Sequence, residues 1–450
     1  MGKGTTKEMT SGSTMKLILG FAVPLLMGML FQQVYGLVDT IIVGRFLGVS
    51  ALAAVGATSS LSSLLIGFLQ GLTNGFAVIA AQFFGAQDFK GLKRCVAASL
   101  SLGCAIAIFI TAAALIFLHP LLALLNTPAD VIDLSGDYIS IIFAGLIISM
   151  LYNVCSALLR AIGDSITPLI FLAVSVVLNI FLDLLCIFPL AMGVRGAAVA
   201  TVISQLIAML ACFFYMIKRY EILRLHREDF HGISGELTKD LLSCGLSMGF
   251  MSSLVNLGTV ALQTSINTLG TDIIVAHTAA RKISELFMLI FSVFGTTMAT
   301  FCGQNLGAGE IRRIKEGIKK SVLYSWIWCL GVIVVTWLFA PDLIYLVTGS
   351  SNPVVIKNAV AYLRFDTLFY FVTALICVIR NAMQGIGDHI TPLVSSSLEL
   401  VGKVVFALIF VPLLGYRGVI LAEPVSWFIM VVPLLIQICR TPILKEKRAD

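Results

Sequence analysis

The sequence predicts an all-α integral membrane protein with twelve transmembrane helices in two pseudo-symmetric six-helix bundles around a central cleft. Three observations lead to this fold class: composition, the length of the apolar runs and an internal repeat. Of 450 residues, 58% are hydrophobic and 12% charged, with a mean hydropathy of +1.00, whereas a soluble domain carries about 25% charged residues. Apolar runs of about 20 residues or more, enough to cross a bilayer of about 30 Å, recur along the whole chain. The runs are continuous rather than alternating, which excludes a β-barrel.

Twelve such runs follow one another, and one long polar connector, KRYEILRLHREDFHG from residue 218, divides them into six and six. We therefore predict an N-terminal lobe over residues 1–219, a cytoplasmic linker over 220–237 and a C-terminal lobe over 238–450. The first apolar run is too long for the h-region of a signal peptide, so it is expected to remain as a span. The predicted spans are about 17–43, 52–82, 92–118, 133–158, 167–190, 195–219, 238–268, 275–303, 317–341, 356–384, 391–413 and 417–439.

Lysine and arginine gather in alternate loops. One set contains Lys93 and Arg94, the central connector, the stretch 312–320 and the basic C-terminal tail, whereas the other loops hold few basic residues. By the positive-inside rule both termini are cytoplasmic, in a multi-pass protein of the cell (inner or plasma) membrane. These clusters are interpreted as solvated loop ends that set topology, and the alternative is a patch that binds lipid or nucleic acid. Membrane lipid is an expected partner of the protein, and nucleic acid is not.

An internal repeat joins the two halves. AAQFFGAQD (80–88) matches CGQNLGAGE (302–310) at an offset of 222 residues, and AIGDSITP (161–168) matches GIGDHITP (385–392) at 224. Each half has an even number of spans, so both insert the same way up, as parallel repeats about an axis along the membrane normal. This arrangement suits alternating access, in which two lobes rock around a central site.

One carboxylate, Asp39, lies inside the first apolar run, where an acid costs about 2.5–3.5 kcal/mol on insertion scales. An intramembrane acid is by default a functional candidate. Counting residues from the predicted span ends puts Asp39, Asp183 and Thr201 in the same outer third of the membrane. Asn179 and Tyr35 each lie four residues before one of these acids and share its helix face. We expect these five residues to meet in the first lobe.

Such a cluster can hold a proton, because two neighbouring carboxylates in a low dielectric resist ionising together. Its oxygens can equally ligate Na⁺, and the ligands would then be Asp39, Asn179, Asp183 and Thr201. Two structural alternatives stand beside these: a satisfied polar plug between helices, and an Asp39 that is interfacial and solvated.

The second half lacks this cluster, since the counterparts of Asp39 and Asp183 are Ala261 and Phe406. It carries instead Glu399 and Lys403, four residues apart, and Glu423, the counterpart of Thr201. These form either a neutralised structural pair, the favoured interpretation, or a candidate substrate or second polar site. A further charged group lies in span 8 and consists of Arg281, Lys282 and Glu285. These residues either line the cleft or neutralise one another locally, and the second interpretation is favoured.

The sequence offers no sign of an enzyme or of a bound cofactor. It contains no G-x-x-x-x-G-K-[ST] and no H-E-x-x-H, so energy must come from an ion gradient or another subunit. The ten cysteines lie singly in apolar segments and are expected to be core residues rather than disulfide or zinc ligands.

Several motifs together resemble the multidrug and toxic compound extrusion (MATE) family: VDTIIVGRFLG (38–48) after a proline-bearing first helix, and the paired IGD-x-I-T-P motifs. The resemblance implies a cation-coupled antiporter, acting as a monomer, that exports organic cations or amphipathic compounds in exchange for H⁺ or Na⁺. It places Tyr35, Asp39, Asn179, Asp183 and Thr201 on positions linked to cation coupling. Pro24 falls where the first span is thought to bend.

One departure from the family concerns span 7. Some relatives carry an acid there, but residues 247–260, SMGFMSSLVNLGTV, contain none, which puts coupling schemes that need it in doubt. Two rival functions remain: a lipid-linked precursor flippase of the same superfamily, and a channel or membrane sensor.

Overall fold

The computed structural model describes residues 8–124 and 131–442, and this part of the chain is built from helices. Ten helical segments are long and apolar enough to span a membrane, and two bent helix pairs raise the number of candidate spans to twelve. The straight spans are α1 (Thr14–Phe46), α2 (Val49–Gly85), α3 (Phe89–Ile116), α7 (Ile166–Ile187), α8 (Gly193–Arg219), α10 (Gly235–Ile266), α11 (Thr271–Gly307), α12 (Ile311–Thr348), α15 (Ile390–Val405, continued by the π-helix η3, Phe406–Phe410, and by α16, Val411–Leu414) and α17 (Tyr416–Arg440).

The two bent pairs occupy equivalent places in the two halves. α5 (Ile132–Ala144) and α6 (Leu146–Ala161) meet at 43°, and α13 (Pro353–Leu368) and α14 (Tyr370–Gly385) meet at 52°. Each pair coincides with one run that the sequence predicts as a span. The remaining elements are short: α4 (Leu118–Leu124), η1 (Glu221–Leu223), α9 (Arg227–His231) and η2 (Asn267–Leu269). The prediction of an all-helical membrane protein with two repeated halves is confirmed, and the predicted twelve spans are reached when each bent pair counts as one span.

The helices pack into two compact units whose boundaries differ from the two halves of the sequence. The first unit contains Gly20–Gly249, and the second contains Met9–Leu19 together with Phe250 onwards. Helices α1 and α10 therefore each contribute to both units. The short N-terminal segment is anchored inside the second unit, where the Met9 backbone N–H donates to Gln304 at 2.9 Å and Arg313 donates to the Gly12 carbonyl at 2.8 Å.

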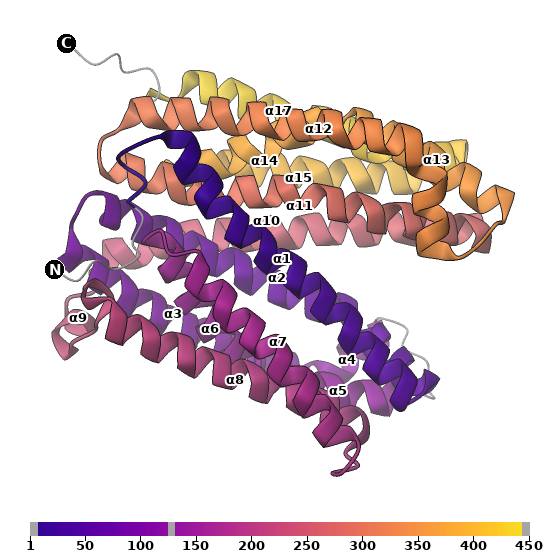
Figure 1. The fold of residues 1–450 in the computed structure, drawn as a ribbon, viewed down its shortest axis with the longest axis horizontal. Coiled ribbons are helices and arrows are strands. Elements are labelled where there is room, and N and C mark those ends of the chain that lie inside the picture. Colours follow the sequence, from indigo (N-terminus) through magenta and orange to yellow (C-terminus); the bar gives the residue numbers. More distant parts are fainter. Residues whose placement is uncertain (1–7, 125–130, 443–450) are drawn as a thin grey trace. The chain divides into compact units, whose positions relative to one another are not determined.

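Helices pack in the same pairs in both units (Figure 1). In the first unit α2 packs against α3, α5 and α6, and α7 packs against α8. In the second, α11 packs against α12, α13 and α14, and α15 packs against α17. The internal repeat of the sequence is thus a repeat of packing, so counterpart residues occupy equivalent positions in their bundles.

The repeated IGD-x-I-T-P motif is a turn that starts a helix. Gly163 and Gly387 have φ of 86° and 94°, a conformation that costs glycine little because it has no Cβ. The following aspartate then caps the next helix: Asp164 Oδ1 accepts from Thr167 N at 3.0 Å, and Asp388 Oδ1 accepts from Thr391 N at 3.0 Å. The motif therefore fixes where α7 and α15 begin.

Close approach of α2 and α10 within the first unit depends on glycine. A Cβ on Gly75 would lie 2.5 Å from the Cα of Gly245, and one on Gly71 would lie 2.4 Å from the Met248 carbonyl oxygen. Small residues of this kind let two helix backbones pack directly in a membrane, where no hydrophobic force drives association.

Candidate functional site

The five polar residues predicted to meet in the first lobe come from three helices of the first unit. Tyr35 and Asp39 are on α1, Asn179 and Asp183 on α7, and Thr201 on α8. The Thr201 hydroxyl donates to the Ala197 carbonyl at 3.0 Å, so its oxygen can accept from its neighbours. Tyr35 Oη lies 3.3 Å from it. The structure thus brings α1 and α8 together at this hydroxyl.

Asn179 links Thr201 to Asp183. With one orientation of its amide, Nδ2 donates to Thr201 Oγ1 at 3.3 Å. With the amide turned over, Nδ2 donates to Asp183 Oδ2 at 3.0 Å and the amide oxygen accepts from the Thr201 backbone N–H at 3.2 Å. The second orientation satisfies both ends of the amide and is the better hydrogen-bond arrangement.

Each of the two acids has an oxygen that makes no hydrogen bond. Asp183 is fully buried, and Oδ1 of both Asp183 and Asp39 lies out of solvent with no partner among the described residues. The two carboxylates are close enough to interact electrostatically. No described basic side chain forms an ion pair with either one. Buried acids without a cation are costly, so the arrangement calls for a proton or a metal cation.

A sixth residue, Tyr138 on α5, was missed by the sequence reasoning. Its phenol lies within electrostatic range of Asp39, Asp183 and Tyr35. The repeat could have found it, because Tyr138 and Tyr362 are related by the offset of 224 and Tyr362 donates to Glu423 at 3.4 Å in the second unit. Of the two tyrosines, Tyr362 is hydrogen-bonded to an acid of its lobe, and Tyr138 lies near enough to the acids of its own lobe to interact with them electrostatically.

Next to the acids, a cavity of about 240 Å³ opens within the first unit. Tyr35 lines the cavity and is also one of the five residues of the polar cluster. The other polar side chains of its wall carry amides or hydroxyls and no charge: Gln32, Gln70, Ser149, Tyr152, Asn153, Ser175, Ser204 and Gln205. The cavity can hold part of a small organic molecule one helix turn from the coupling candidates.

The second unit holds a self-neutralised set of charges. Lys403 Nζ lies 2.9 Å from Glu399 Oε1, 3.4 Å from Glu423 Oε1 and 3.4 Å from Thr259 Oγ1, so each of its three donors has an acceptor. Arg281 Nη1 donates to Glu423 Oε1 at 2.7 Å. Glu399, Lys403 and Glu423 are all buried. Their contacts make this cluster an internal ion-pair network.

Two features of this network differ from the sequence expectation. Arg281 was expected to be neutralised locally, but its short contact is to Glu423 on α17, and Glu285 lies 3.9 Å away. The buried Asp366 on α13 was overlooked; its Oδ2 accepts from Ser284 at 3.4 Å, and its Oδ1 has no hydrogen-bond partner in the described part of the chain. Asp366 interrupts an apolar run as Asp39 does, so the same reasoning would have found it.

Within the described residues, no group of three or more His, Cys, Asp or Glu side chains could hold a metal. A Na⁺ site of two carboxylates, an amide and a hydroxyl is of a different kind, because its ligands are hard neutral and anionic oxygens. All ten cysteines are free; seven of them are buried as expected of core residues, whereas Cys104 and Cys377 are half-buried and Cys439 is exposed.

The repeat, the helix order and the two bundles point to one known family. The MatE family model matches twice, at residues 24–185 and 248–409. The chain belongs to the MatE family. The two matches begin 224 residues apart, the offset of the repeated turn motif, so each half carries one copy of the family's unit. The protein is therefore a membrane transporter rather than an enzyme, and the MATE resemblance is confirmed.

Relatives along the whole chain agree with this membership. A probable multidrug resistance protein of Bacillus subtilis (strain 168), YpnP, is 29% identical over 417 residues, which cover 92% of each chain. A protein of Shewanella oneidensis named as an FAD transporter is 22% identical over 426 residues, again 92% of each chain. The relatives of this chain are thus named for different cargo.

The fold is also that of solved MATE transporters. One structure, described as the outward-facing conformation of a multidrug resistance MATE family transporter of the MOP superfamily, matches with a TM-score of 0.91 and 27% sequence identity. The match covers 99% of this chain and 100% of the other.

Proposed function

We propose that this MatE transporter is a secondary active multidrug exporter that exchanges amphipathic compounds or organic cations for H⁺ or Na⁺. The observation that carries the proposal is the pair of acids, Asp39 and Asp183, each with a buried oxygen that lacks a partner among the described residues and neither with a basic neighbour there. The names of relatives such as YpnP support a drug-like cargo.

The proposed coupling site consists of Asp39, Asp183, Asn179, Thr201 and Tyr35. A proton shared by the two acids, or a Na⁺ ion held by Asp39, Asn179, Asp183 and Thr201, would neutralise the cluster. Loss of that cation leaves two interacting carboxylates in a low-dielectric site, which strains the packing of α1 against α7 and α8. Ion entry and release would thus change how favourably α1 packs against α7 and α8, and therefore which position of α1 is the more stable one.

Pro24 is the proposed bending point of α1. Its ring removes one backbone hydrogen bond and crowds the carbonyl four residues earlier, that of Gly20. Gly20 is where the described chain of α1 enters the first unit, after Leu19 in the second. The weak point of the helix therefore coincides with its passage from one unit to the other, which suits a hinge.

We further propose that the transporter lies in the inner or plasma membrane with both termini in the cytoplasm and acts as a monomer. The basic side chains near the helix ends Arg94, Arg219 and Arg313 support this orientation; the basic residues Lys445, Lys447 and Arg448 lie outside the described residues. Reporter fusions at the C-terminus check it, because alkaline phosphatase is active only outside the cytoplasm and a fluorescent protein fused there would fold inside.

Efflux of ethidium from proteoliposomes under an imposed proton or sodium gradient tests the function. The wild type should export the dye under one of the two gradients, and Asp39→Asn should not. Asp137→Asn is the matched control, because Asp137 is a surface acid of the same lobe paired with Arg195 at 2.7 Å. Normal gradient-driven export by Asp39→Asn would show that the coupling assignment is wrong.

The same vesicles separate the rival functions. A lipid-linked precursor flippase would move a fluorescent phospholipid-type precursor and leave ethidium inside. A channel would release dye without any dependence on the gradient, and a sensor would release none. Substrate-for-ion exchange in a fixed ratio supports the antiporter alone.

A further inference from the structure

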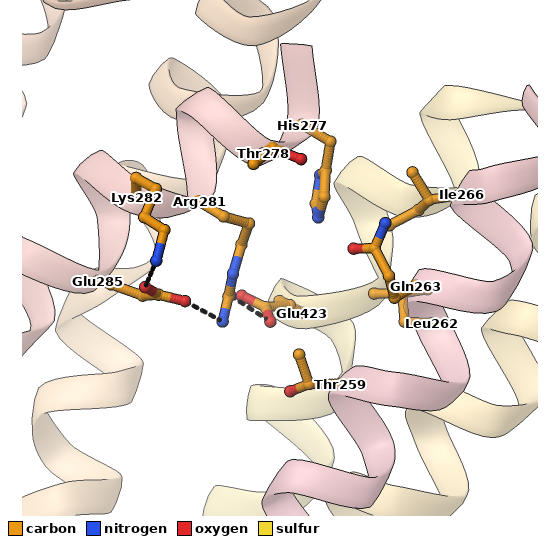
Figure 2. Close-up of a pocket in the computed structure, with 10 residues that line it drawn as sticks. All are labelled: Thr259, Leu262, Gln263, Ile266, His277, Thr278, Arg281, Lys282, Glu285 and Glu423. Atoms are coloured by element: carbon orange, nitrogen blue, oxygen red, sulfur yellow. Dashed lines mark hydrogen bonds and ion pairs between the residues drawn. The ribbon is translucent and has the colours of Figure 1, made fainter. Parts of the chain in front are cut away.

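The second unit contains a polar pocket of about 160 Å³ that the coupling scheme does not use (Figure 2). It lies between α10 and α11, beside the buried ion pairs. Pockets that enclose a drug-sized ligand have volumes of about 300 Å³ or more, so this pocket can receive only one end of such a molecule. Its donor groups come from Thr259, Gln263, His277, Thr278, Arg281 and Lys282.

The two acids that border this pocket are held very differently. Glu423 is nearly fully buried and hydrogen-bonded: it receives Arg281 Nη1 at 2.7 Å and Tyr362 Oη at 3.4 Å, and Lys403 lies 3.4 Å away. It is a fixed part of the wall. Glu285 is 43% exposed and lies 3.8 Å from Lys282 and 3.9 Å from Arg281. Both distances exceed hydrogen-bond length, so this acid is loosely held.

The basic groups of the pocket therefore have unused capacity. The Arg281 guanidinium carries five N–H groups, more than its hydrogen bonds to Glu423 and Tyr362 use. Lys282 is 68% exposed and lies at the open side. His277 is buried and lines the pocket, and its Nδ1 has no hydrogen-bond partner among the described residues. A planar, bidentate donor beside an ammonium is the usual recognition pattern for a carboxylate.

We propose that this pocket binds the carboxylate of an amphipathic zwitterionic or anionic substrate, which displaces Glu285 from Arg281 and Lys282. When the pocket is empty, the carboxylate of Glu285 lies beside Arg281 and Lys282. The carboxylate of the ligand would take that place, so the basic groups have a negative partner both with and without ligand. The inference rests on the proposed export of drug-like compounds and names the residues of this chain that would recognise an acidic group on such a compound.

A pair of dyes that differ only at the acid tests this. Rhodamine B carries an ionised benzoate, and its ethyl ester does not. Binding of each dye to the purified full-length transporter is followed by fluorescence anisotropy without any ion gradient, so the result does not depend on coupling. Glu285→Gln removes the internal competitor and should tighten rhodamine B about threefold or more, without tightening the ester. Lys282→Met should weaken rhodamine B about tenfold and leave the ester unchanged or tighter.

Glu316→Gln provides the matched control. Glu316 is 42% exposed and is paired with Lys320 four residues on, but on α12 away from this pocket; its loss should change neither dye. Equal shifts for both dyes in Glu285→Gln, or an unchanged rhodamine B affinity in Lys282→Met, would overturn the proposal. If the wild type binds the ester but not the acid, the carboxylate site is refuted while export of cations stands. If it binds neither dye, both proposals fail for this class of compound.

Discussion

Asn179 and Lys403 occupy equivalent positions in the two lobes. They are separated by the offset of 224 that also relates the starts of their helices, Ile166 and Ile390. In the first lobe the position carries a neutral amide beside the acid Asp183, and in the second an ammonium bonded to Glu399. In the first lobe Asp39 and Asp183 thus have no cationic partner among the described residues. In the second lobe the side chain of Lys403 is itself the cation that pairs with the acid.

The ion dependence of the first lobe should be visible as stability. A ligand that binds only the folded state stabilises it, by about 2.7 kcal/mol at a hundred times its dissociation constant. We expect the melting temperature of the wild type to rise either with NaCl at constant ionic strength or with falling pH in Na⁺-free buffer. Asp183→Asn should lose that rise, while Asp137→Asn should keep it. A rise of wild-type size in Asp183→Asn would contradict a role for Asp183 in holding the ion.

The ion-pair network of the second lobe should behave as one unit. Lys403→Met leaves Glu399 buried without its ammonium, and breaking a buried pair costs about 3–5 kcal/mol. The double variant Lys403→Met/Glu399→Leu should recover much of this loss in thermal unfolding, because it removes the stranded charge as well. Lys320→Met, which breaks an exposed pair, should cost at most about 1 kcal/mol. A double variant no more stable than Lys403→Met would refute the coupling between the two side chains.

Replacing Pro24 should slow transport without weakening binding. Pro24→Ala restores a backbone N–H and removes the ring that crowds the Gly20 carbonyl, so α1 becomes stiffer at the proposed hinge. We expect dye turnover in proteoliposomes to fall several-fold while the dissociation constant of the dye stays the same. Pro341→Ala in α12 makes the same chemical change in another helix and should leave turnover near the wild-type value. Equal slowing by both variants would point to general stiffness rather than a hinge.

The contact between α2 and α10 should depend on the glycines of α2 that face α10, such as Gly75, and not on Gly56, a glycine of α2 with open space around it. Gly75→Ala places a methyl 2.5 Å from the Gly245 Cα, so the two backbones must separate. We expect a loss of about 1–3 kcal/mol in unfolding free energy, of the size seen for overpacking. Gly56→Ala meets nothing within 4 Å and should be neutral or stabilising by up to about 1 kcal/mol. The order of the two melting temperatures checks the prediction, which a Gly75→Ala variant as stable as Gly56→Ala would contradict.

Most residues of the proposed coupling site could be predicted by counting residues from the ends of the predicted spans. Asp39, Asp183 and Thr201 could be placed at one depth because a helix rises by a fixed amount per residue and the membrane fixes where it starts and ends. Asn179 and Tyr35 could then be assigned to the same cluster, because residues four apart in a helix lie on the same face. Tyr138 was missed because the search began from charged residues within apolar runs, and a tyrosine is uncharged.

The sequence by itself determined the all-helical membrane fold, the two-fold repeat and the family, because hydropathy and local motifs depend only on residues close together in the chain. The tertiary structure decided which acids are paired and which are not. The Arg281–Glu423 contact joins residues 142 positions apart, and the loose hold on Glu285 depends on side-chain distances between neighbours on one helix. Charge pairing between distant helices is set by how their faces are rotated toward each other, which a linear pattern does not specify.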